Sequence, residues 1–253
     1  MSERWSLRAR LLAGESTTGC FLGLGSPSVT ELLGHVGFDW LVLETEHSAV
    51  DVAQLEHMLR ALGASGSTPI VRVPPRDPVF IQRALDLGAG GVIVPLIRSA
   101  DEAREVVAAT RFPPQGTRSF GPLRAARYSL DYARYLETAN DEMLVGFIIE
   151  TREALESIEE IAAVPGVDVL FLGLFDLCLS LGVDPLALPL PEVDAAIERV
   201  LGAGARHGVA VGHSARSRDE LEQLRARGFR FIGYGTDYFL LLNAARAAFE
   251  EPR

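Results

Sequence analysis

The chain has 253 residues, a length that suits one large domain, and 48% of them are hydrophobic, enough for a sizeable core. Its 24 basic and 34 acidic residues give a net charge of −10, which argues against nucleic acid or an anionic membrane as the main partner. The two cysteines, Cys20 and Cys178, match no metal or redox spacing, and no stretch has the apolar length of a secretory signal or a membrane helix. We therefore expect a reduced, cytoplasmic protein. The acidic balance still permits a small anionic substrate in a locally basic pocket.

Short apolar runs alternate along the chain with amphipathic helical patterns, as in parallel α/β proteins. The predicted strands are Gly19–Leu24, Trp40–Glu44, Pro69–Val73, Gly91–Pro95, Leu144–Glu150, Val167–Gly173, Val209–Gly212 and Phe229–Gly233. The predicted helices are Ser28–Gly34, Val50–Leu62, Pro78–Leu87, Ala100–Thr110, Arg152–Ala163, Pro191–His207, Arg218–Arg227 and Tyr238–Glu250. This alternation predicts a single (β/α)8 barrel over residues 1–253, with an open doubly wound sheet as the alternative.

One connection departs from the alternation. Residues 111–140 read RFPPQGTRSFGPLRAARYSLDYARYLETAN, a segment with five arginines and several turn residues. Long insertions of this kind usually serve a site or an interface. A solvated excursion is the simpler alternative.

Two carboxylates follow neighbouring predicted strands at the carboxyl-terminal face, where barrels place their catalytic groups. Glu150 closes the apolar run of the fifth strand, and Asp176 follows the sixth in GLFD. Such a pair offers hard oxygen ligands and leaves positions for substrate and water, as Mg²⁺ or Mn²⁺ requires. The alternative is that each carboxylate only stabilises the N-terminus of the helix that follows.

Two further polar side chains lie at the same face. His47 follows the second strand in ETEH, where it is either a general base oriented by Glu44 or Glu46, or a surface-loop residue. Arg72 lies inside the apolar segment PIVRVPP, and a buried guanidinium needs an anionic partner. That partner is Glu44 or Asp86 if the role is structural, and a substrate carboxylate if it is functional.

Other features narrow the chemistry. No complete GxGxxG or P-loop follows a strand, which disfavours a dinucleotide or ATP enzyme. The sequence contains no lysine, so catalysis through an imine is excluded. Among the remaining histidines, only His213, at the end of the seventh strand, is placed to meet a substrate.

The C-terminal helix has apolar residues on more than one face, whereas a helix that packs on one side only needs a single apolar face. The apolar positions are Phe239, Leu240, Leu242, Ala245 and Phe249. We expect this helix to contact another subunit. The alternative is that its second apolar stripe packs under the chain's own segment Trp5–Leu12.

With these positions in view, the chain resembles the HpcH/HpaI family of class II pyruvate aldolases, which cleave 2-keto-3-deoxy sugar acids and 4-hydroxy-2-oxoheptanedioate. The resemblance runs from about Gly19 to Ala245. Its segments are LGLGSPSVTELLGHVGFDWLVLETEHSAV, TPIVRVPPRDP, ALDLGAGGVIVPLIRSADEA, RFPPQGTRS, IETREALESI and GVDVLFLGLFDL. Their ordered combination is highly specific, although each piece alone is weak.

The resemblance implies a barrel of the phosphoenolpyruvate/pyruvate superfamily and a site built around a divalent ion: Mg²⁺, Mn²⁺ or Co²⁺. In such a site Glu150 and Asp176 hold the metal, pyruvate binds the ion through two oxygens, and Arg72 stabilises the enolate oxygen. His47, oriented by Glu44, moves the proton.

The same resemblance extends to the assembly and to substrate contacts. Asp86 matches a residue that reaches the site of a neighbouring subunit, and family members exchange the C-terminal helix in homo-hexamers. The backbone N–H groups of Phe175 and Asp176 are expected to hold the pyruvate carboxylate.

Three departures from the family pattern bear on substrate choice. Gly173-Leu174-Phe175-Asp176 replaces the usual Gly-Pro-Ala-Asp, so a ring borders the aldehyde site. Ile148 stands where glutamine is frequent, and Glu44 where aspartate is commoner. The metal core survives these changes, while the acceptor aldehyde, and pyruvate against hydroxypyruvate as donor, stay open.

Three rival functions remain. A citrate-lyase-type enzyme acting on a CoA thioester would share the metal barrel, but it usually lacks the Glu46-His47 step. A non-catalytic barrel that binds a keto acid is favoured only by Ile148 and Phe175. A purely structural assembly protein would not need Arg72, Glu150 and Asp176 together.

Overall fold

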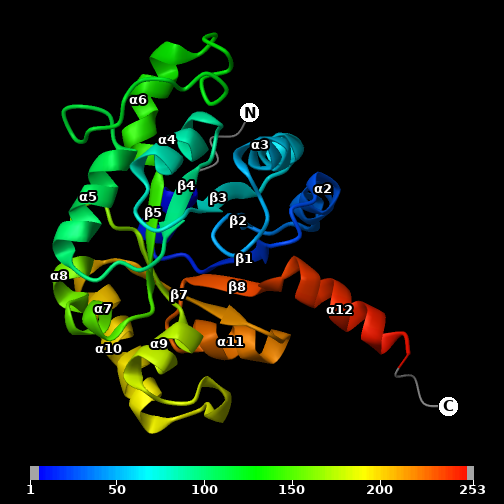
Figure 1. Cartoon of the computed structure of the whole chain (residues 1–253), viewed down its shortest axis with the longest axis vertical. Helices are drawn as coiled ribbons and strands as arrows, with labels where there is room; N and C mark the ends of the chain where they lie inside the picture. The colour runs from blue at the N-terminus through cyan, green and yellow to red at the C-terminus, as the bar shows by residue number, and fades with distance from the viewer. Residues whose placement is uncertain (1–5, 250–253) are drawn as a thin grey trace.

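The structure is a computed structural model that describes residues 6–249. Eight parallel strands pair in chain order, and β8 pairs with β1 to close the barrel, which confirms the predicted fold class (Figure 1). The strands are β1 (Thr17–Leu22), β2 (Trp40–Glu44), β3 (Thr68–Arg72), β4 (Gly91–Val94), β5 (Leu144–Ile149), β6 (Val169–Leu172), β7 (Ala210–Ala215) and β8 (Phe231–Thr236). Strands β7 and β8 each end three residues later than predicted.

Most of the helices form the outer layer of the barrel, and the others lie within the connections between strands. They are α1 (Leu7–Leu12), α2 (Pro27–Val36), α3 (Val52–Ala61), α4 (Pro78–Asp86), α5 (Ala100–Thr110), α6 (Tyr132–Glu142), α7 (Arg152–Glu156), α8 (Ile158–Ala162), α9 (Leu174–Leu181), α10 (Pro191–His207), α11 (Arg218–Ala226) and α12 (Asp237–Ala247), with short 3-10 turns at Leu62–Ala64 and Pro185–Ala187. Helices α1, α6 and α9 were not predicted. The predicted helix Arg152–Ala163 is divided into α7 and α8, and Glu250, the predicted end of the last helix, lies outside the described residues.

Apolar side chains form two core layers because alternate residues of each strand face opposite sides of the sheet. One layer lies between the strands and the helices, and the other fills the barrel interior. Inside, the Trp40 and Phe231 rings stack with centroids 3.8 Å apart. A Cβ atom at Gly19 would lie 2.0 Å from the Trp40 ring, so only glycine permits this stack.

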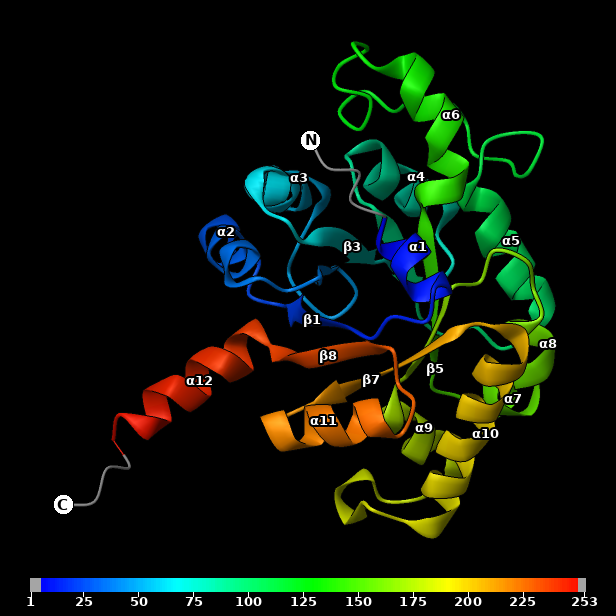
Figure 2. The same ribbon diagram turned by 180° about the vertical axis from the view of Figure 1, so that it is seen from behind.

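Helix α1 covers the amino-terminal end of the barrel (Figure 2). Leu7 and Leu11 are buried in the interior layer, and Arg8 pairs through Nε with Asp168 Oδ1 at 2.8 Å. The alternative in which the C-terminal helix packs against Trp5–Leu12 is therefore not found for the described part of that segment, which packs on the barrel instead; Trp5 lies outside the described residues.

Two parts of the chain extend beyond the barrel. Helix α12 projects outward, and α6 with the excursion before it rises past α4 in both views (Figures 1 and 2). Every residue from 241 to 249 is exposed. No helix within residues 6–249 has the length and apolar character needed to cross a bilayer.

Candidate active site

A cavity of about 540 Å³ opens at the carboxyl-terminal ends of the strands. Seven of the predicted site residues line it: Arg72, Ile148, Glu150, Gly173, Leu174, Phe175 and Asp176. The rings of Phe21 and Phe171, whose centroids are 5.3 Å apart, belong to the barrel interior and also line the cavity. The structure therefore brings most of the predicted residues together, at the end of the barrel where catalytic groups are usually found.

Arg72 lies between two carboxylates. It ends β3 in register with Glu44, which ends β2, and its Nη1 contacts Glu44 Oε2 at 3.2 Å. Its Nη2 contacts Glu46 Oε2 at 2.5 Å. The buried Nε–H of Arg72 has no hydrogen-bond partner among the described residues. Asp86 is therefore not its partner, and one donor is still available to a ligand.

Glu150 is almost fully buried, with 3% of the residue exposed. It follows β5 directly, and its Oε1 accepts a hydrogen bond from the N–H of Leu96 at 2.8 Å. Burial raises the pKa of this carboxyl, the Leu96 bond and Arg72 oppose the shift, and Glu46 and Asp176 add to it. The capping alternative fails for Glu150, because Thr151 Oγ1 caps α7 through the N–H of Ala154.

Asp176 lies in the first turn of α9 rather than at the end of a strand. Helix α9 begins at once because Gly173 brings the chain close to β5: a Cβ there would lie 2.8 Å from Ile148 Cγ2 and 3.0 Å from Glu150 Oε2. The close approach places Asp176 and Phe175, both exposed, on the rim of the cavity that Glu150 lines.

His47 is on the loop after β2, with 64% of its side chain exposed, and it does not line the cavity. Its imidazole Nε2 lies 3.4 Å from Glu46 Oε2. Glu44 Oε1 instead accepts the backbone N–H groups of Glu46 and His47 at 2.7 and 3.0 Å. In this structure Glu44 therefore orients the loop, and Glu46 is the carboxylate nearest to the ring.

Glu46 has a raised pKa as well. Burial is the largest cause, and the charges of Arg72 and His47 oppose it. On this side of the mouth, several acidic groups thus surround the Arg72 guanidinium, an arrangement that favours binding of a further cation.

Asp86, another predicted site residue, does not line the cavity. It ends α4, and its Oδ1 accepts a hydrogen bond from Arg118 Nη2 at 2.7 Å. Arg118 belongs to the excursion and is fully buried, with its guanidinium 4.5 Å from the centre of the Phe112 ring. Asp86 therefore anchors the excursion through Arg118.

Several cavity residues escaped prediction because β7 and β8 are longer than their patterns indicated. The cavity is also lined by Ser214 and Ala215 at the end of β7, Arg216 directly after it, Gly235 and Thr236 at the end of β8, and Tyr238 and Phe239 in α12. His213, which was singled out, lines it too, and its buried Nδ1 has no hydrogen-bond partner among the described residues. The sequence did contain one signal for these residues: Arg216, a charged residue shortly after the apolar run of the seventh strand.

The donor chemistry at the mouth fits a divalent cation. Glu150 and Asp176 both supply carboxylate oxygens to the cavity, and the recorded hydrogen bonds leave Glu150 Oε2 without a donor. The described residues contain no group of three or more His, Cys, Asp and Glu side chains placed to hold a metal. A cation here would therefore take its remaining ligands from substrate and water, as Mg²⁺ commonly does.

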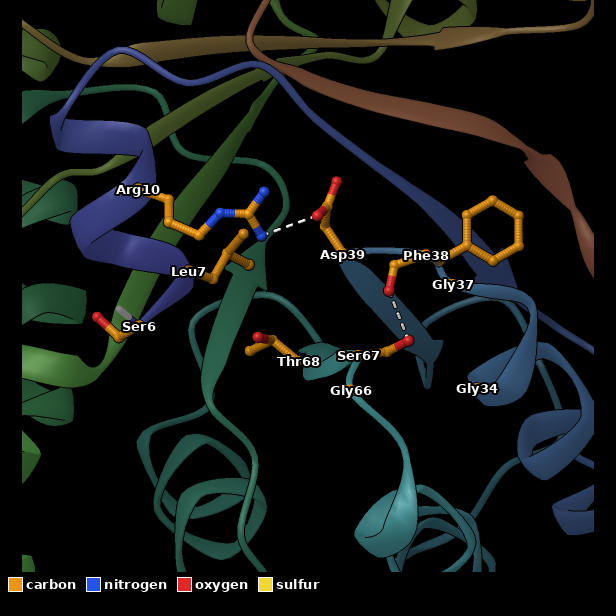
Figure 3. A pocket seen from close by; sticks show the side chains of 10 residues that line it. All are labelled: Ser6, Leu7, Arg10, Gly34, Gly37, Phe38, Asp39, Gly66, Ser67 and Thr68. Atoms are coloured by element: carbon orange, nitrogen blue, oxygen red, sulfur yellow. Dashed lines mark hydrogen bonds and ion pairs between the residues drawn. The ribbon is translucent and has the colours of Figure 1, made fainter. Parts of the chain in front are cut away.

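A second hollow, of about 510 Å³, lies at the opposite end of the barrel between α1 and the starts of β2 and β3 (Figure 3). Its polar groups already pair with one another: Arg10 Nη1 lies 2.8 Å from Asp39 Oδ1, and Ser67 Oγ donates to the Phe38 carbonyl at 2.6 Å. Because these groups are satisfied, this hollow has less to offer a ligand than the mouth of the barrel.

The closed barrel and its mouth, with a guanidinium and several carboxylates, define a barrel enzyme of the kind that binds a small anionic substrate. Residues 17–244 match the profile of the HpcH/HpaI aldolase/citrate lyase family, and the chain belongs to that family. This confirms the resemblance found in the sequence.

Individual relatives match over nearly their whole length. The chain is 38% identical to a hydroxypyruvate/pyruvate aldolase of Paraburkholderia phytofirmans, covering 98% of this chain and 97% of the relative. It is 40% identical to a 4-hydroxy-2-oxo-heptane-1,7-dioate aldolase of Shigella sonnei, covering 96% and 92%. The crystal structure of an HpcH/HpaI aldolase/citrate lyase family protein from Burkholderia cenocepacia superposes with a TM-score of 0.92 at 40% identity, covering 97% and 98%.

Proposed function

We propose that this protein is a divalent-metal-dependent class II aldolase that interconverts 4-hydroxy-2-keto acids with pyruvate, or hydroxypyruvate, and an aldehyde. The proposal rests on one observation: Arg72, Glu150 and Asp176 line the same cavity at the mouth of the barrel. The relatives named as aldolases support the same reaction type.

Glu150 and Asp176 would hold the ion, which could be Mg²⁺, Mn²⁺ or Co²⁺. When bound, the ion supplies a Lewis acid that polarises the keto group of pyruvate. The backbone N–H groups of Phe175 and Asp176, in the first turn of α9, would hold the pyruvate carboxylate, since helix N-termini favour anions. Ile148 and Leu174, which line the cavity beside them, would contact the methyl side of the donor.

Arg72 would stabilise the negative charge that develops on the C2 oxygen when C3 gives a proton to solvent water at the open mouth of the cavity, and in cleavage C3 takes a proton back from solvent. Its unpartnered Nε–H is the donor available for that oxygen, while Glu44 and Glu46 keep the guanidinium in place. Both carboxylates would act as positioning residues, because they touch Arg72 and the His47 loop.

His47 would move the proton of the acceptor. In the synthetic direction, C3 attacks the aldehyde carbon, a carbon–carbon bond forms, and the aldehyde oxygen takes a proton. In cleavage, the C4 hydroxyl gives up that proton and the same bond breaks. An imidazole suits both directions at neutral pH. His47 is exposed in the single subunit, so we propose that closure of its loop or a neighbouring subunit brings it to the substrate.

We further propose a homo-hexamer in which α12 packs on a neighbouring subunit and Asp86 completes the neighbour's site. The supporting observations are the exposed run from 241 to 249 and the apolar side chains on it, of which Phe249 is 91% exposed. Asp86 remains 17% exposed beside the excursion, so its second oxygen can reach a neighbour.

The test is pyruvate release from a panel of 4-hydroxy-2-keto acids, with a CoA thioester such as citryl-CoA as the competing substrate. Chelation should abolish turnover, and Mg²⁺, Mn²⁺ or Co²⁺ should restore it. Glu150→Gln and Asp176→Asn should each weaken metal binding, measured by calorimetry, while circular dichroism shows the fold retained. Full turnover of metal-stripped protein in a chelating buffer would exclude metal dependence, and cleavage of the thioester alone would favour the citrate-lyase reaction.

A further inference from the structure

Arg216 is a cationic side chain at the rim of the cavity, and neither of its terminal Nη nitrogens has an ion partner among the described residues. It directly follows β7 and lines the cavity, with 75% of its side chain exposed. Its recorded ion contact is from Nε to Glu220 Oε2 at 3.6 Å, on the exposed surface. Glu220 Oε2 also accepts the backbone N–H of Arg216 at 2.8 Å. The backbone is therefore fixed, while the guanidinium remains available.

The charges around the cavity have a clear layout. Of the described residues that line it, only Arg72 and Arg216 carry a permanent positive charge. Arg72 ends β3 and Arg216 follows β7, and these strands are four apart in a closed barrel of eight, so the two arginines lie on opposite sides of the mouth. Glu150 and Asp176 lie between them, after β5 and near the end of β6.

The wall on the Arg216 side carries several apolar side chains beside the polar His213, Ser214 and Thr236. Phe175 in α9, Leu186 in the 3-10 turn that follows it and Phe239 in α12 line the cavity there. A substrate that extends from Arg72 toward Arg216 would therefore pass apolar, largely aromatic side chains before it meets a second cation. Such a cavity matches a molecule with an anion at each end and a short apolar middle.

We propose that Arg216 is a specificity residue that binds a terminal anionic group on the acceptor aldehyde: a carboxylate, sulfonate or phosphate. The inference rests on the proposed aldol reaction, in which the keto-acid end lies near Arg72. In the cleavage direction, the preferred substrate is then a 4-hydroxy-2-keto acid with a second negative charge at its far end. A guanidinium suits this role because it presents several donors to oxyanions.

The experiment compares two acceptors of equal carbon number, 4-oxobutanoate and butanal, in condensation with pyruvate by the metal-loaded enzyme. Wild type should prefer 4-oxobutanoate in kcat/KM. Arg216→Ala should lower that preference by up to about fivefold, mainly through KM for 4-oxobutanoate, since an exposed charge contact contributes modestly. Arg216→Lys should keep part of the preference. Arg218→Ala is the matched control, because this exposed arginine two residues away does not line the cavity and its removal changes the net charge equally.

A second pair, glyceraldehyde 3-phosphate and glyceraldehyde, identifies the anionic group. In each pair, the measured quantity is the preference for the charged over the neutral acceptor. The pair in which Arg216→Ala lowers this preference more contains the anionic group that the site favours. Equal losses for charged and neutral acceptors, or equal effects of Arg216→Ala and Arg218→Ala, would overturn the proposal. Pyruvate C3–H exchange by wild type separates this failure from failure of the aldol function itself: exchange with unchanged selectivity refutes only the role of Arg216, whereas wild type without exchange or turnover refutes both.

Discussion

At the scale of single residues, the site depends on the way Arg72 is held. A guanidinium with two carboxylates at 3.2 and 2.5 Å is fixed in position, and its remaining Nε–H cannot be satisfied within the described part of the subunit. An unsatisfied buried donor carries a desolvation cost that a ligand oxygen would remove. The arrangement therefore has the preorganisation expected of a group that stabilises developing negative charge.

Arg72→Ala and His47→Ala should impair the enzyme in different ways. Loss of the arginine removes charge stabilisation from the enolate, so pyruvate C3–H exchange and condensation should both fall, by roughly a hundredfold or more. Loss of the histidine should slow condensation and cleavage while exchange persists, because His47 acts on the acceptor proton. Exchange is measured by NMR in deuterium oxide and turnover by pyruvate release. Equal loss of exchange in both variants would contradict this division of roles.

His213 should make stability depend on pH. Burial lowers its pKa from the usual 6.5, with a backbone hydrogen bond at Leu172 opposing the shift, so the unfolded chain binds a proton more readily than the folded one. The free energy of unfolding should therefore hold above pH 6.5 and fall as the pH drops toward the folded-state pKa, by at most about 1.4 kcal/mol per pH unit for one group.

Urea unfolding at pH 7.5 and pH 5.5 tests this directly. His213→Asn should lose less stability over that interval than wild type. His35→Asn, at an exposed position on α2, should behave as wild type. An identical acid-induced loss in wild type and His213→Asn would show that the folded protein protonates this imidazole without penalty.

At the scale of elements, periodicity was a good guide wherever a segment faces one side of the barrel. Strands such as β2 are continuously buried and β-rich, and α10 shows a regular apolar face, so both were predicted to within a residue. Helix α9 was missed because its start depends on the close packing of Gly173 against Ile148 and Glu150, a tertiary contact that no local pattern contains. The polar ends of β7 and β8 were missed for a related reason: residues at the mouth face the cavity rather than a core.

Some site residues could therefore be predicted from the sequence and others could not. Arg72 and Glu150 were found because a charge inside or after an apolar run is conspicuous. Arg216 was not, because the predicted seventh strand stopped at Gly212 and left this arginine in a loop. The role of α1 was also hidden, since six residues are too few for a clear helical period.

Helix α1 should contribute to stability as a plug of the barrel. Leu11 is 2% exposed in the interior layer, whereas its neighbour Leu12 is 56% exposed. Leu11→Ala should therefore lower the free energy of unfolding by about 2–5 kcal/mol, the usual cost of emptying a buried leucine site. Leu12→Ala, the matched control, should change it by less than about 0.5 kcal/mol. Urea unfolding of both variants measures the difference, and equal small effects would mean that α1 detaches without consequence.

At the scale of the whole molecule, the chain is a closed barrel from which one largely apolar helix projects. The barrel core is closed and well filled, yet α12 extends from it with nine consecutive exposed residues at 241–249. Exposed apolar surface of this kind usually marks an interface. The base of the helix is nevertheless firmly attached: Asp237 is buried, and its carboxylate accepts the N–H groups of Gly23 and Leu24 at 2.9 and 3.0 Å.

The last prediction follows from that contrast. A chain cut after Asp237 keeps the anchor but loses the apolar helix, and it should be poorly soluble or inactive if α12 covers a neighbour. Because a truncated chain can fail for other reasons, Leu241→Arg is the sharper variant: Leu241 is 63% exposed, so an isolated subunit tolerates the change, whereas an interface buries the charge. Light scattering should find wild type as a hexamer and Leu241→Arg as smaller, folded species with reduced turnover.

If sites are shared, mixing two inactive variants, Asp86→Asn and Arg72→Ala, should restore part of the activity, because some sites then receive both intact residues. A fully active monomer, or no recovery on mixing subunits that are shown to exchange, would refute the shared site.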